Sequence, residues 1–192
     1  EGILEVPFVV LKSNKTYVDV FKHLVSRGPN YGKSYGFAYP GMCAINRDLK
    51  IPPIRQYWEA KAGVDVTQYV GITSDEQDRL MRMNGTNRIS LLQKYGVSKA
   101  EAGKLCERNR MRYPVYRFTN RNGCWFCPKQ PLASLRIIYD RFPKLWEQLK
   151  IWQKDSPVSF TSRTTITELD ERFKAGYYPR IINRKKNIGD KK

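Results

Sequence analysis

Apolar and polar positions along the first part of the chain follow strand-like and helix-like spacings in turn. The run Glu5–Ser13, "EVPFVVLKS", is apolar at most positions and predicts a buried strand. The next segment, "TYVDVFKHLVSRG", places Val18, Phe21 and Val25 on one face of a helix. A second strand is predicted at Thr67–Thr73, "TQYVGIT". Strands and helices in alternation are typical of an α/β domain.

Several helix starts are marked by local signals. Ser74 with Gln77 predicts a capping box that opens a helix "DEQDRLMRM", and Ser98 with Glu101 predicts a second, opening "KAEAGKLCERNRM". Two further helices are expected in "ASLRIIYDRF" and "PKLWEQLKIWQK", the second beginning at Pro143. Between the two predicted strands, a basic segment after the first cysteine leads into a helix interrupted by proline.

The composition changes near the carboxyl end. From Ser156 onward the chain is polar, with a short helix expected in "TITELDERF" and a charged end in "INRKKNIGDKK". We therefore expect one domain in residues 1–155 and a basic C-terminal tail in residues 156–192. The longest apolar run, "VPFVVL", is too short for a membrane span or a signal-peptide core, so we expect a cytoplasmic protein.

Charge adds a prediction about partners. The chain has 35 Lys and Arg residues against 18 Asp and Glu residues, a formal net charge of +17. Such a surplus favours a polyanionic partner, namely nucleic acid, nucleotide phosphates or an acidic protein. The alternative is a surface that is charged only for solubility.

Two of the four cysteines lie in a C-x-x-C turn, "NGCWFCPKQP". A disulfide between Cys124 and Cys127 is disfavoured because a domain of this size can pack its own core. A thioredoxin-type dithiol sits at a helix N-terminus, whereas Pro128 and Pro131 allow a helix only from about residue 131. Metal or cluster ligation is the interpretation we favour, with burial in the core as the alternative.

A C-x-x-C pair supplies only half of a tetrahedral site, so two further ligands are required. The other cysteines are Cys43 and Cys106, and the single histidine, His23, falls in an ordinary helix pattern. We therefore predict a four-cysteine site made by Cys43, Cys106, Cys124 and Cys127. The spacing does not choose between zinc and an iron–sulfur cluster.

A basic and aromatic stretch surrounds this turn and predicts a nucleic-acid-binding face. The basic residues of this face are Arg108, Arg110, Arg112, Arg117, Arg121 and Lys129, interleaved with Tyr113, Tyr116, Phe118, Trp125 and Phe126. The alternative is a solvated charged face beside an aromatic core.

Four segments together resemble the phosphoadenosine phosphosulfate reductase family of the PP-loop adenine-nucleotide hydrolase superfamily. They read "MCAINRDLKIPPI", "YVGITSDEQDRL", "ISLLQKYGVSKAEAGKLCERNRMRYPVY" and "RNGCWFCPKQPLASLRIIYDRFPKLWEQL". The resemblance covers roughly residues 1–155. Its most specific elements are the Cys-(x)n-Lys-Ile-x-Pro segment and the Gly-Cys-Trp-Phe-Cys-Pro turn.

The resemblance implies a Rossmann-like parallel sheet flanked by helices and binding of ATP or a related adenine nucleotide. Some members carry a four-iron, four-sulfur cluster held by cysteines placed like Cys43, Cys124 and Cys127. Arg47 and Lys50 match basic positions that face the nucleotide's phosphate or sulfate.

A nucleotide site is also expected where the strand at Thr67–Thr73 turns into the next helix, because α/β folds bind anions at such turns. The alternative is that the acidic residues of this turn serve only the helix dipole. The expected nucleotide-binding residues are Arg47, Lys50, Ser74, Glu76 and Arg79.

The chain departs from the family in two respects. It has no Ser-Gly-Gly-x-Asp-Ser phosphate loop and no Glu-Cys-Gly-Leu-His tail, which carries the catalytic cysteine of the classical reductases. We therefore expect part of a sulfur-transfer or sulfonucleotide-reductase-like enzyme, completed by a phosphate loop from a preceding segment or a second polypeptide. If the basic face binds nucleic acid, we expect nucleic acid to be the substrate of this enzyme. The sequence assigns no catalytic residue. The alternative is a non-catalytic nucleic-acid-binding module with a structural zinc site.

Overall fold

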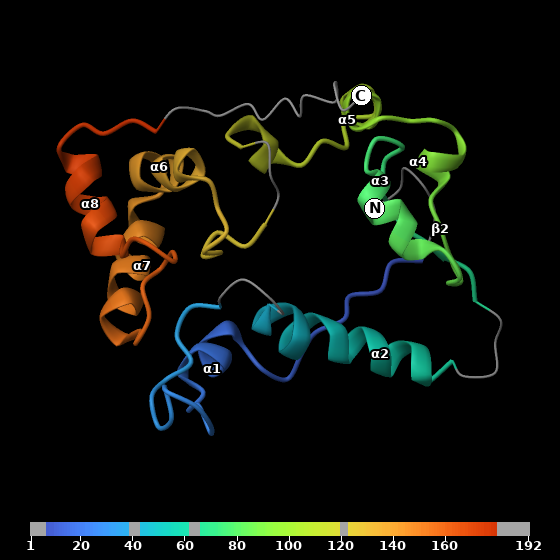
Figure 1. Ribbon diagram of the computed structural model, residues 1–192. Coiled ribbons are helices and arrows are strands. Elements are labelled where there is room, and N and C mark those ends of the chain that lie inside the picture. The colour runs from blue at the N-terminus through green and yellow to red at the C-terminus, as the bar shows by residue number, and fades with distance from the viewer. Residues whose placement is uncertain (1–6, 39–42, 62–65, 120–122, 180–192) are drawn as a thin grey trace, which may run out of the picture. The chain divides into compact units, whose positions relative to one another are not determined.

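The computed structural model describes residues 7–38, 43–61, 66–119 and 123–179 (Figure 1). The chain forms two compact units, of which unit 1 comprises Glu1–Glu59 and Gly123–Lys192 and unit 2 comprises Ala60–Asn122. Within the described ranges, no helix is both long and apolar enough to cross a membrane.

Unit 1 is helical. Its elements are α1 (Tyr17–Lys22), the π-helical turn η1 (Asn46–Lys50), α2 (Ile51–Glu59), α6 (Leu132–Arg141), α7 (Pro143–Asp155) and α8 (Ile166–Lys174). Helices α6, α7 and α8 pack against one another (Figure 1). The predicted start of α7 at Pro143 is confirmed. Proline suits this position because the N–H that it lacks would have no helical partner in the first turn.

One hydrophobic cluster joins these three helices to the N-terminal segment. Phe21 and Phe37 meet edge to face at 5.4 Å between ring centroids, and Phe37 packs in the same way on Phe160 at 4.9 Å. Leu135 and Leu149, from α6 and α7, are fully buried in the same cluster. The core of unit 1 therefore combines residues from both ends of the chain.

The prediction of a basic tail in residues 156–192 is wrong for its first part, which contributes to this core. Phe160, Ile166, Leu169 and Phe173 are at most 2% exposed. Helix α8 begins with a capping box at Thr165 and presents an apolar stripe to α6 and α7, which the polar average composition conceals. The change at Ser156 marks the end of α7, and the segment that follows supplies Phe160 and one face of α8 to the packed core. Residues 180–192 lie outside the described part.

The predicted strand Glu5–Ser13 is not formed in its described part, residues 7–13. Phe8, Val9 and Val10 are 88%, 53% and 62% exposed. An apolar run becomes a strand only when a neighbouring strand pairs its backbone groups and a second layer covers its side chains. Among the described residues nothing does either for this run.

Helix α1 differs in length and face from the prediction. It ends at Lys22, and Val20 and Phe21 are buried while Val18 is 40% exposed. Beyond α1 the chain turns back on itself, where the Val25 N–H donates to the Lys33 carbonyl at 2.9 Å. This turn, with an isolated antiparallel bridge between Leu24 and Ser34, takes the place of the second half of the predicted helix.

Prolines shape the helix that follows the first cysteine. The helical segment runs from Ala44 to Glu59, and Pro52 and Pro53 cannot donate backbone hydrogen bonds. The turn before them widens to a π-helix, in which the Ile51 N–H donates to the Asn46 carbonyl. The predicted Pro-interrupted helix is thus confirmed, and the interruption takes the form of the π-helical turn η1.

Unit 2 contains short elements around a small sheet. They are β1 (Gln68–Tyr69), α3 (Gln77–Leu80), the 3-10 helix η2 (Met81–Met83), β2 (Arg88–Ile89), α4 (Leu91–Lys94), α5 (Lys99–Arg108) and the 3-10 helix η3 (Pro114–Arg117). Strands β1 and β2 are parallel, with Gln68 opposite Arg88 and Tyr69 opposite Ile89. In the described ranges the architecture is therefore mixed helical with a two-stranded parallel sheet, and the expected strand Thr67–Thr73 is reduced to two residues.

The two predicted capping boxes have different outcomes. At α5 the Ser98 N–H donates to the Glu101 carboxylate at 2.8 Å, and the Ser98 hydroxyl accepts from the Glu101 N–H, as predicted. At α3 the capping box at Ser74 is wrong, because the helix begins only at Gln77. The turn is instead closed one residue earlier, where the Thr73 N–H donates to the Glu76 carboxylate at 3.2 Å.

Candidate metal or cluster site

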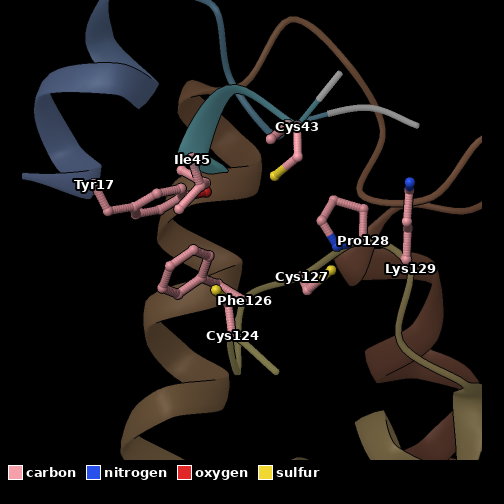
Figure 2. Close-up of a pocket in the computed structure, with 9 residues that line it drawn as sticks. Tyr17, Cys43, Ile45, Cys124, Phe126, Cys127, Pro128 and Lys129 are labelled. Atoms are coloured by element: carbon pink, nitrogen blue, oxygen red, sulfur yellow. The ribbon is translucent and has the colours of Figure 1, made fainter. Parts of the chain in front are cut away.

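Two distant segments of unit 1 line one pocket with three cysteines (Figure 2). Cys43 directly precedes the helical segment that starts at Ala44, and its carbonyl accepts from the Arg47 N–H at 2.9 Å. Figure 2 shows Cys43 on one side of the pocket and Cys124 and Cys127 on the other. All four cysteines of the chain are free thiols.

The C-x-x-C segment is a tight turn ahead of α6. The Cys127 N–H donates to the Cys124 carbonyl at 3.0 Å, and the Gln130 N–H donates to the Cys127 carbonyl at 3.1 Å. The Gln130 side-chain amide also donates to the carbonyls of Cys124 and Trp125. Helix α6 starts only at Leu132, as the prolines predicted. The two thiols therefore lack the helix N-terminus that activates thioredoxin-type dithiols.

The two aromatic residues inside the C-x-x-C turn hold it against the helical core. Trp125 stacks on Trp152 of α7 at 5.4 Å between ring centroids. Phe126 stacks on Tyr17 of α1 at 3.9 Å, and Tyr17 in turn contacts Trp152 at 4.8 Å. Trp125 and Phe126 are thus packing residues of unit 1, which corrects their assignment to a nucleic-acid-binding face.

Burial and neighbouring charges act on the thiols. Burial raises the pKa of the Cys124 thiol, the Lys50 ammonium opposes this, and the thiols of Cys127 and Cys43 raise the pKa further. Lys129, predicted as a nucleic-acid contact, lines the same pocket. The pocket thus holds three thiols and Lys129, and the charge of Lys50 acts on one of the thiols. Positive charge favours a thiolate or another anionic group at this place.

Tyr17 also lines the pocket, and its hydroxyl oxygen is buried without a hydrogen-bond partner. Burial raises the pKa of Tyr17 above its ordinary value, and the nearby Cys124, Cys127 and Cys43 thiols raise it further. The phenol therefore stays protonated near neutral pH and remains a hydrogen-bond donor.

The predicted four-cysteine site is not seen as a group. In the described part of the chain, no three His, Cys, Asp or Glu side chains lie close enough together to hold one metal ion. Cys106 belongs to unit 2, where it is exposed on α5. A zinc ion needs sulfurs about 2.3 Å away from it. An iron–sulfur cluster spreads its ligands around a larger cage. Iron–sulfur clusters are held by cysteine thiolates, so the pocket of Cys43, Cys124 and Cys127 fits a cluster in ligand type.

The expected nucleotide-binding residues fall in both units. Arg47 and Lys50 are exposed on η1 of unit 1, and Arg47 pairs with Asp48 at 2.5 Å. Ser74, Glu76 and Arg79 belong to unit 2, where Arg79 pairs with Glu76 at 2.7 Å. Arg47 and Arg79 each already have a carboxylate partner within three residues along the chain, so an anion would have to compete with that partner.

The predicted nucleic-acid face is likewise divided. Arg108, Arg110, Arg112 and Arg117 are exposed on unit 2, and Arg112 pairs with Glu107. Arg121 lies outside the described residues, and Lys129 belongs to the cysteine pocket of unit 1.

The sequence did not predict that Tyr17 and Lys129 line the cysteine pocket. Tyr17 carries no motif, and only its place in the apolar pattern of α1 marks it. Lys129 directly follows the C-x-x-C-Pro segment, and that adjacency is the signal that could have assigned it to the cysteine site.

Comparisons with protein-family models, with curated proteins and with solved structures gave no match to this chain.

Proposed function

We propose that this protein holds an iron–sulfur cluster through Cys43, Cys124 and Cys127. The observation that carries the proposal is that thiols from positions 43 and 124–127 line one pocket. Clusters are held by cysteine thiolates, and three of the chain's four cysteines are available there. The fourth ligand is left open in this proposal, and zinc on the same residues is the alternative metal.

The proposed activity is that of an adenine-nucleotide-dependent sulfur-transfer or sulfonucleotide-reductase-like enzyme. It is supported by the sequence resemblance and by the charge around the pocket. Lys50 acts electrostatically on Cys124, and Lys129 lines the same pocket, so a phosphate or sulfate group held by either lysine would lie beside the thiols. When bound, a cluster supplies a sulfur-rich centre that positions or activates the transferred sulfur.

The proposal includes a phosphate-loop segment and the rest of a Rossmann-like sheet, supplied by a preceding segment or by a second polypeptide. The exposed apolar side chains of Phe8, Val9 and Val10 support it, because a sheet that included this run, with a layer packed on it, would cover them. The cytoplasm is the proposed compartment, since thiols stay reduced there.

A second candidate function is nucleic-acid binding, which is compatible with sulfur transfer to DNA or RNA. Tyr113 and Phe118 are 60% and 39% exposed beside the arginines of unit 2. If these rings belonged to a core, as the alternative interpretation required, they would be buried. Exposed rings among arginines are suited to stacking on bases.

The cluster is tested by loading the full chain anaerobically with ferrous iron and sulfide. We expect a brown protein that retains both after desalting, and expect Cys43→Ser, Cys124→Ser and Cys127→Ser each to lose most of its iron. Cys106→Ser asks separately whether Cys106 is the fourth ligand. A colourless protein with one zinc per chain would establish the zinc alternative. A wild-type protein that retains neither metal refutes the proposal.

A further inference from the structure

The Tyr17 hydroxyl is a buried donor without an acceptor. In the described part of unit 1 it is the buried side-chain polar atom that lacks a hydrogen-bond partner. Buried polar groups are nearly always paired, and an unpaired one costs stability. An orphaned donor beside three thiols therefore points to an acceptor that belongs in the same pocket.

The ring of Tyr17 has little freedom to turn away. It stacks on Phe126 with centroids 3.9 Å apart and planes 25° apart, and it also contacts Trp152 and Phe21. Helix α1 itself is anchored by a capping box between Thr16 and Asp19. Figure 2 shows the ring reaching from α1 into the cysteine pocket. Its position is set by packing and not by a bond from its hydroxyl.

From this geometry we infer that the Tyr17 hydroxyl donates a hydrogen bond to a sulfur of the group held by Cys43, Cys124 and Cys127. The inference rests on the proposed cluster and adds a residue outside the cysteine set. The acceptor is a ligand thiolate or a cluster sulfide, both of which accept hydrogen bonds. Tyr17 is thus a positioning residue that tunes the bound group and need not touch substrate.

A hydrogen bond to sulfur has a defined electrochemical consequence. Reduction adds negative charge to a cluster, and a donor aimed at sulfur stabilises that added charge and raises the reduction potential. Removing the hydroxyl while keeping the ring should lower the potential. Tyr17→Phe makes this change and preserves the stacking on Phe126 and Trp152.

The test compares wild type, Tyr17→Phe and a control, Tyr139→Phe, in the anaerobically loaded full chain. Tyr139 belongs to the same unit and packs on Trp146, away from the residues that line the pocket. We expect a more negative midpoint potential and faster cluster loss for Tyr17→Phe, with neither change in the control. If the wild type holds zinc, we expect Tyr17→Phe to bind zinc about tenfold more weakly, as loss of an outer-shell partner does.

Metal-free protein supplies an independent readout. Because the hydroxyl is unpartnered there, Tyr17→Phe should unfold at the same or higher denaturant concentration than wild type. A residue that bonds elsewhere in the protein, or to an ordered water, would give the opposite result. Stability lost without metal, or an unchanged potential and cluster retention in a loaded wild type, overturns this inference alone. A wild type that loads neither iron nor zinc overturns the proposed function together with it.

Discussion

Replacing Phe173 by alanine should destabilise unit 1 by about 3 to 5 kcal/mol, the usual cost of removing a buried phenylalanine side chain. Phe173 is 2% exposed. Its ring contacts Trp146 at 5.5 Å and Tyr139 at 5.4 Å, and the Arg136 guanidinium lies 5.3 Å from it. Alanine would leave a cavity between α6, α7 and α8 that these stiff neighbours cannot fill.

Tryptophan fluorescence isolates this effect to unit 1. All four tryptophans, at positions 58, 125, 146 and 152, belong to that unit. With a urea slope of about 2 kcal/mol per molar, the unfolding midpoint should fall by roughly 2 M. Ile151→Ala, at an apolar position of α7 that is 52% exposed, is the control and should shift the midpoint far less. Equal midpoints for Phe173→Ala and wild type would mean that α8 is a tail after all.

Two further predictions address the anion sites. Lys50→Ala should weaken ATP binding by about 1 to 3 kcal/mol, because a charge-assisted phosphate contact is lost. The affinity is measured by calorimetry with the phosphate-loop segment present and with Lys154→Ala as the control. Equal affinity of Lys50→Ala and wild type would contradict the prediction. Binding of single-stranded DNA, measured by fluorescence anisotropy, should fall steeply between about 50 and 200 mM salt, because bound cations are released from the DNA. The double variant Arg108→Gln, Arg117→Gln should flatten that salt dependence, and absence of binding at low salt would reject the nucleic-acid candidate.

The sequence alone determined the features that depend on a few neighbouring residues. The capping box of Ser98 and Glu101, the start of α7 at Pro143 and the tight turn through Cys124 and Cys127 all follow from local backbone chemistry. In each case the partner atom lies within a few positions along the chain, so spacing is sufficient to predict the contact.

Tertiary structure decided the features that need a distant partner. The apolar run at residues 7–13 lacks a paired strand and is exposed, whereas the polar-looking segment at 156–179 supplies Phe160 and Phe173 to the core. Trp125 and Phe126 pack on Trp152 and Tyr17. No local pattern reports whether a side chain finds a partner more than a hundred residues away, and the unpartnered hydroxyl of Tyr17 beside the cysteines is visible only once that packing is known.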